Sequence, residues 1–144
     1  MIRVAEIAAY LPIVLAAIGW YIASYFTLVY YGLVAANTSL MPRVCRLEEQ
    51  TCQTVLNTRY ARVFGVPNSL LGLLYYSIVI VILSCGWEGG PLGAVLIAVA
   101  WFTVALGFVL VYSLLFVIRI PCPLCLAGHT INLALAILLT FNLG

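Results

Sequence analysis

Apolar residues run through this chain in four long blocks, separated by shorter polar stretches. The blocks cover about residues 7–36, 68–84, 91–118 and 122–142. Each approaches or exceeds the roughly 20 apolar residues that a helix needs to cross a bilayer. Lipid offers no hydrogen-bond partners to a backbone, so apolar runs of this length fold as helices. The pattern predicts an all-α membrane protein, a bundle of four transmembrane helices forming one domain over residues 1–144.

Composition and charge agree with a membrane location. Hydrophobic residues make up 66% of the chain and charged residues only 7%, whereas soluble domains carry about 25% charged residues. The net charge of +2 is too small to indicate a nucleic-acid partner. The first apolar block is longer than the roughly 7–15 residues of a secretory signal core, so we expect it to remain as the first span.

The connection 37–67 is the only long one, and it carries most of the charge. It holds four of the six arginines and two of the five cysteines. Within it, apolar residues recur at helical spacing with arginines on the other side; the apolar positions are Leu56, Tyr60, Val63 and Phe64, and the arginines are Arg59 and Arg62. This pattern predicts a short amphipathic helix that lies in the interface and caps the bundle. We expect Asn68 to follow as the N-cap of the second span.

The cysteines divide between the two sides of the membrane. With four spans, the first and third connections must lie on the same side. Four cysteines therefore gather at one face, and these are Cys45, Cys52, Cys122 and Cys125. Cys85 ends the second span on the opposite face, where we expect an inert apolar side chain.

The fourth span carries a narrow polar stripe. At 100° per residue, its polar side chains fall within an arc of about 80°; they are Cys122, Cys125, His129 and Asn132. Polar groups at membrane depth normally face the bundle interior or a cavity, so the stripe predicts an internal site. The helix N-terminus and Arg119 would both stabilise a thiolate at Cys122. His129 fits equally well a hydrogen bond to a neighbouring carbonyl.

The residues alone leave two kinds of chemistry open for these cysteines. A CxxC that faces a second cysteine pair is typical of redox exchange or of metal binding. Four thiolates, or three with His129, could close a tetrahedral zinc site. Zinc mainly organises small water-exposed domains, which favours the redox interpretation, and we expect no bound metal.

The sequence resembles the vitamin K epoxide reductase family, including its prokaryotic members. The resemblance is carried by C-x6-C at 45 and 52, "VLNTRYARVFGVPNSLLGLLYY" at 55–76 and "CPLCLAGHTIN" at 122–132. It implies a four-helix bundle around a quinone, which receives electrons from a partner's thiols through two cysteine pairs. The chain has no recognisable thioredoxin-like segment, so the expected partner is a separate thioredoxin-fold thiol protein. The expected quinone is ubiquinone or menaquinone, in a prokaryotic cell membrane.

The same resemblance implies roles for individual cysteines. Cys122 and Cys125 match the pair beside the quinone, with Cys125 as the thiol that attacks the ring. Cys45 and Cys52 match the shuttle pair. Cys45 would meet the partner protein, and Cys52 would pass electrons to Cys122.

The resemblance also implies residues that contact the quinone. Asn68 matches an amide that hydrogen-bonds one quinone oxygen. His129 stands where animal members have a tyrosine that bonds the second oxygen. Thr58 matches a hydroxyl position in the cap helix, and Leu56 an apolar position facing the pocket.

These expectations combine into one function and one alternative. We expect a quinone-dependent thiol oxidoreductase that generates protein disulfides, because quinones are stronger oxidants than most protein disulfides. The alternative is a non-catalytic membrane protein whose cysteines form a structural metal or disulfide site.

Two arguments about orientation disagree. The cysteine side carries five of the six arginines, and the other side carries only Arg3. The excess of cations on cytoplasmic loops therefore places the cysteines in the cytoplasm. The habit of the resembled family places them on the exported side.

Overall fold

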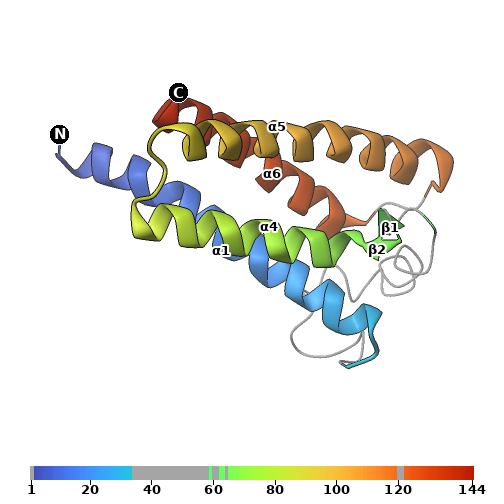
Figure 1. Cartoon of the computed structure of the whole chain (residues 1–144). Helices are drawn as coiled ribbons and strands as arrows, with labels where there is room; N and C mark the ends of the chain where they lie inside the picture. Colours follow the sequence, from blue (N-terminus) through green and yellow to red (C-terminus); the bar gives the residue numbers. More distant parts are fainter. Residues whose placement is uncertain (1, 34–58, 60–61, 64, 120–121) are drawn as a thin grey trace.

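The computed structural model describes residues 2–33, 59, 62–63, 65–119 and 122–144. These residues contain four long helices (Figure 1), namely α1 (Ile2–Tyr30), α4 (Asn68–Cys85), α5 (Pro91–Tyr112) and α6 (Pro123–Leu143). A π-helical turn, η2 (Ser113–Val117), continues α5. All four segments are long and apolar enough to cross a membrane, so the prediction of an all-α membrane protein with four spans is confirmed.

The first span begins and ends earlier than the predicted range 7–36, since α1 covers Ile2–Tyr30. Its end is set by Gly32, which has a φ of 71°. The Leu33 N–H then donates to the carbonyl of Leu28 over 2.9 Å. A glycine in the left-handed conformation closes a helix in this way at little steric cost. The apolar sequence continues past this glycine, and for that reason hydropathy alone placed the end too late.

The second span ends by the same device. Gly86 has a φ of 68°, and the Trp87 N–H donates to the carbonyl of Ile82 over 3.0 Å. Cys85 is the last residue of α4 and its side chain is exposed. The predicted position of this cysteine at the end of the span is therefore confirmed.

The predicted cap helix lies largely outside the described residues. Where the chain is described, Arg62–Val63 forms strand β1, which pairs antiparallel with β2 (Val66–Pro67). Gly65, with a φ of 79°, makes the turn between them. The helical pattern is therefore wrong at Val63, because its backbone pairs with Val66 across this turn.

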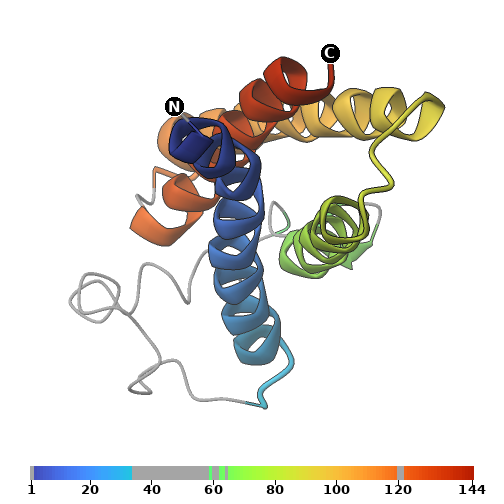
Figure 2. The same cartoon turned by 90° about the vertical axis from the view of Figure 1, so that its left-hand side faces the viewer.

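The helices are joined mainly through α1 and α6. Most contacts between elements join α1 to α4, α5 to α6 and α1 to α6, and Figures 1 and 2 show α1 crossing the helices on which it packs. Small residues are buried between the helices, since Ala16, Ala100 and Ala136 are 0% exposed. Small side chains let membrane helices pack closely without a large hydrophobic driving force.

The two ends of the molecule differ in content (Figure 1). One end carries the C-terminus of α1, the β1–β2 hairpin and the start of α6. The opposite end carries both chain termini and the turn after Cys85. Among the described residues, Cys122 and Cys125 therefore lie at the end opposite Cys85, as the four-span topology predicts.

Candidate functional site

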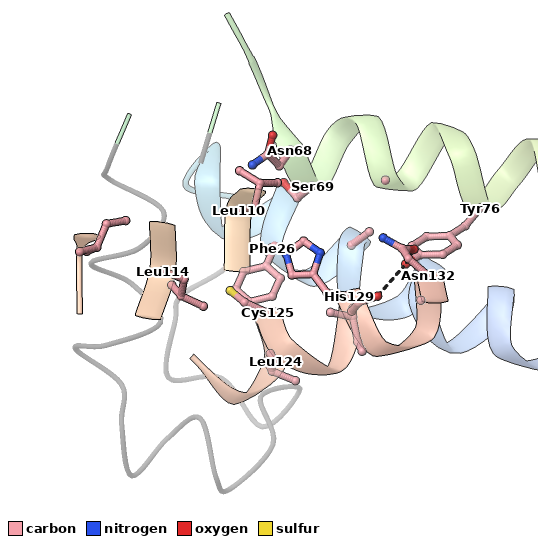
Figure 3. Close-up of a pocket in the computed structure, with 16 residues that line it drawn as sticks. Phe26, Asn68, Ser69, Tyr76, Leu110, Leu114, Leu124, Cys125, His129 and Asn132 are labelled. Atoms are coloured by element: carbon pink, nitrogen blue, oxygen red, sulfur yellow. Dashed lines mark hydrogen bonds between the residues drawn. The ribbon is translucent and has the colours of Figure 1, made fainter. Parts of the chain in front are cut away.

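A cavity of about 160 Å³ opens near the hairpin end, between all four helices. Its walls are mostly apolar, and the polar side chains on it are Asn68, Ser69, Tyr76, Cys125, His129 and Asn132. Figure 3 shows these groups converging from α4 and α6. An apolar cavity of roughly 150 Å³ accommodates a benzene molecule, so this space suits about one substituted six-membered ring.

The start of α6 places the CxxC beside the cavity. Cys122 has an extended backbone, with φ −116° and ψ 107°, and occupies the N-cap position before Pro123. Its carbonyl accepts the Leu126 N–H over 3.1 Å, which closes the first turn of the helix. The proline suits this first helical position because it has no N–H to satisfy.

The two CxxC thiols have different surroundings. No disulfide joins the two cysteines, and their side chains lie next to each other. Cys122 is 0% exposed and packs in a cluster with Tyr25, Phe26 and Leu114. Cys125 lines the cavity, whereas Cys122 is not among the lining residues. The arrangement gives one thiol access to the cavity and keeps its partner directly behind it.

Asn68 reaches the cavity from the start of α4. The N-cap position of this helix belongs to Pro67, with φ −56°, and Asn68 is the first helical residue. The predicted N-cap role of Asn68 is therefore wrong. The reason is tertiary: β2 ends at Pro67, so the chain leaves the hairpin and enters the helix one residue earlier than the sequence indicates.

His129 lines the cavity, one turn beyond Cys125 on the same helix face. Its Nδ1 atom is buried and has no hydrogen-bond partner among the described residues. A Cβ atom built on Gly107 of α5 would lie 2.9 Å from this Nδ1, so this edge of the ring faces α5. His129 also lines a second cavity of about 190 Å³, between α5 and α6.

Tyr76 is a cavity residue that sequence reasoning missed. Its hydroxyl donates to Oδ1 of Asn132 over 2.5 Å and so links α4 to α6. Its ring lies against Gly19 of α1, where an added Cβ would collide with the ring carbons. The signal available was weak, because a tyrosine within an apolar run usually indicates only packing. The matching signal was Asn132, which did belong to the predicted polar stripe.

Four predicted site residues lie outside the part of the chain that the structure describes. They are Cys45, Cys52, Leu56 and Thr58. Their roles, and with them the zinc alternative, stay predictions. Of the predicted stripe, Cys125, His129 and Asn132 are brought together on one cavity, with Cys122 beside it.

Comparison with known proteins identifies a family. The model of the vitamin K epoxide reductase family matches residues 10–140. No curated protein and no solved structure matches the chain. The matched range takes in most of α1, the hairpin, the other three helices and the CxxC. This chain therefore belongs to the vitamin K epoxide reductase family, and it is a multi-pass membrane oxidoreductase linked to a quinone.

Proposed function

We propose that this protein oxidises the thiols of a separate thioredoxin-fold partner and reduces a quinone of the ubiquinone or menaquinone class. Its product would be disulfides in other proteins. The observation that carries the proposal is the position of Cys125, which opens on a ring-sized apolar cavity with Cys122 buried beside it. A thiol pair with one member at such a cavity is suited to electron exchange with a flat apolar cofactor.

The residues on the cavity suit a quinone ring. Leu110, Leu114 and Leu124 provide apolar walls for the ring faces. Asn68 and His129 place polar groups on the same space. The cavity is large enough for a ring but not for a long isoprenoid tail, which would extend toward the lipid. A bound quinone accepts two electrons and two protons and becomes a quinol.

The proposed electron route uses both cysteine pairs. A Cys45–Cys52 disulfide would take two electrons from the partner's dithiol, leaving a disulfide in the partner and two thiols in the loop. Cys52 would then reduce a Cys122–Cys125 disulfide by thiol–disulfide exchange. The inner dithiol returns to a disulfide when it passes two electrons and two protons to the quinone. The direction follows because a quinone is a stronger oxidant than most protein disulfides.

One feature of the fold supports this route. The loop that carries Cys45 and Cys52 enters the β1–β2 hairpin, and the hairpin lies at the same end of the molecule as Cys122 (Figure 1). The same loop carries Leu56 and Thr58, which we propose cover the ring from the hairpin side.

The proposal is tested by following quinone absorbance with purified protein, a reduced thioredoxin-fold dithiol protein and a soluble quinone. Wild type should reduce the quinone, and Cys125→Ala should not. Cys85→Ala is the matched control, because Cys85 ends α4 far from the cavity, which Asn68 lines at the start of the same helix. This variant should retain full activity. Undiminished quinone reduction by Cys125→Ala would refute the proposal. Stoichiometric bound zinc with no quinone reduction in wild type would favour the structural alternative.

A further inference from the structure

Two polar side chains close the end of the cavity that lies away from Asn68. Tyr76 follows Asn68 by eight residues on α4, which is about 12 Å along a helix axis. Asn132 follows Cys125 by seven residues on α6, or about 10 Å. Both Tyr76 and Asn132 line the cavity, so this pair lies at the end remote from Asn68 and Cys125.

The hydrogen bond between these two residues determines which amide atoms stay available. The Tyr76 hydroxyl has one proton, and its nearer acceptor is Oδ1 of Asn132 at 2.5 Å; the carbonyl of Gly128 lies at 3.5 Å. With Oδ1 engaged, the amide keeps two N–H donors on Nδ2. Among the described residues, no side chain or carbonyl accepts a hydrogen bond from this nitrogen. Figure 3 shows the nitrogen of Asn132 directed toward the cavity, on the side of His129.

Tyr76 is held rigidly enough to determine the direction of the amide. Its side chain is only 4% exposed, and its ring rests on the backbone of α1 at Gly19. The bond from its hydroxyl to Asn132 therefore connects three helices through one side chain. An amide held this way at membrane depth keeps its donors aimed at the cavity, and donors without an acceptor are costly there. A ligand with a carbonyl oxygen at this end would supply the missing acceptor.

We propose that Asn132 donates a hydrogen bond from Nδ2 to the quinone oxygen remote from Asn68, and that Tyr76 is the positioning residue for this amide. The inference rests on the proposed function and adds a determinant of substrate class. Donors at both ends of the cavity select a ring with two opposed carbonyl oxygens over a ring of the same shape with one. His129, with Nδ1 facing Gly107, then contacts the ring beside Cys125.

The test compares two ligands of nearly the same shape. Menadione has two opposed ring oxygens, and α-tetralone is a bicyclic ketone with one. Binding of each to purified protein in detergent is measured for wild type and Asn132→Leu, which keeps the side-chain volume and removes the donors. Menadione should bind the variant about tenfold more weakly. The affinity for α-tetralone should change by less than about twofold, since Asn68 remains to bind its single oxygen.

Two further variants separate a ligand contact from a structural role. Asn142 is on the same helix, but its amide donates to the carbonyl of Ala8 and does not line the cavity. Asn142→Leu should therefore leave both affinities unchanged. Tyr76→Phe keeps the Asn132 amide but removes the hydroxyl that orients it. This variant should weaken menadione binding by about threefold and leave the α-tetralone affinity unchanged.

The possible results are distinguishable. Equal menadione binding by wild type and Asn132→Leu would overturn this inference and leave the proposed function standing. A parallel loss of affinity for both ligands would also overturn it, because that result indicates only a collapsed cavity. Absence of saturable menadione binding to wild type would overturn the proposed function and this inference together.

Discussion

Gly107 of α5 lies directly against the imidazole of His129 on α6. Gly107 is buried, and a Cβ atom in its place would stand 2.9 Å from Nδ1 of His129. Such a distance is shorter than normal van der Waals contact, so only glycine leaves the ring where it is. This contact links the packing of two membrane helices to the position of a cavity side chain.

Replacing Gly107 by alanine should therefore push the His129 ring away from α5 and into the quinone cavity. We expect the quinone KM to rise severalfold and the free energy of unfolding to fall by about 1–3 kcal/mol, as for an overpacked core. Steady-state kinetics and denaturant unfolding in detergent measure the two effects. Gly89→Ala is the control, because its Cβ would meet nothing within 4 Å and Gly89 does not line the cavity. A Gly107→Ala protein with wild-type KM and stability would show that the ring does not depend on this glycine.

Removing the amide of Asn68 should weaken quinone binding. We expect Asn68→Ala to lose about 1–3 kcal/mol of binding free energy, because a buried polar atom of the ligand would lose its partner. Titration with a soluble quinone measures the loss. Ser84→Ala, at the exposed far end of α4, should bind as wild type does. Unchanged affinity in Asn68→Ala would leave Asn68 without a role in the cofactor site.

The two cysteine pairs should respond differently to the size of the electron donor. Cys45→Ser should block oxidation of a thioredoxin-fold protein but spare a small dithiol such as dithiothreitol, which can reach the inner pair directly. Cys122→Ser and Cys125→Ser should abolish quinone reduction with either donor, because both would lack the inner disulfide. Quinone absorbance measures all of these rates. An equal loss with both donors in Cys45→Ser would contradict a shuttle.

A hydrogen bond on the outer face of the bundle should matter only for stability. The indole Nε1–H of Trp101 donates to Oγ1 of Thr140 over 2.9 Å and joins α5 to α6. In Trp101→Phe the threonine still donates to the carbonyl of Ala136, so the loss should be about 0.6 kcal/mol, the average for such bonds between membrane helices. Denaturant unfolding in detergent measures it. Trp87→Phe, at the exposed turn after α4, is the control.

The activity of the Trp101→Phe variant is measured as well, because the Trp101 side chain does not line the quinone cavity. Trp101→Phe should keep the wild-type rate of quinone reduction. A fall in rate without a fall in stability would mean that the outer face of α5 takes part in quinone entry.

We propose that in a prokaryotic host the cysteine end faces the cytoplasm. Of the described arginines, Arg59, Arg62 and Arg119 belong to that end and Arg3 to the other, and the cation-rich side of a membrane protein normally stays inside. In intact cells, a membrane-impermeant thiol reagent should therefore label a variant that keeps only Cys85, whose side chain is exposed at the opposite end. A variant that keeps only Cys45 should react only after lysis. The reverse pattern would place the active site on the exported side.

Much of the architecture follows from the sequence by itself. Four apolar blocks determine four helices, because a backbone in lipid must satisfy its own hydrogen bonds. Successive connections alternate between the two sides of the membrane, so Cys85, at the second connection, lies at the end opposite Cys122 and Cys125, which follow the third. Helical periodicity correctly puts Cys125, His129 and Asn132 on one cavity, since three residues of one helix have fixed angular relations whatever packs around them.

Other features depended on contacts between residues far apart in the chain. The spacing of apolar residues predicts a helix at Val63, but this residue pairs with Val66 in a hairpin. Because the hairpin ends at Pro67, Asn68 is the first helical residue and not the N-cap. Local propensity is a weak signal that tertiary pairing overrides. Helix geometry also gave Cys122 and Cys125 similar directions, yet only the packing of α1 and η2 buries Cys122 and leaves Cys125 on the cavity.

The pairing of Tyr76 with Asn132 shows the same limit most clearly. In the sequence, Tyr76 is one aromatic residue in an apolar block, 56 positions from its partner. The sequence around either residue does not predict that the Tyr76 hydroxyl reaches the Asn132 amide. Nor does it predict that Gly19 of a third helix leaves space for the tyrosine ring. The residue types determined what each side chain can donate or accept. Only the packing of three helices against one another decided which donor meets which acceptor, because that depends on distances no single helix contains.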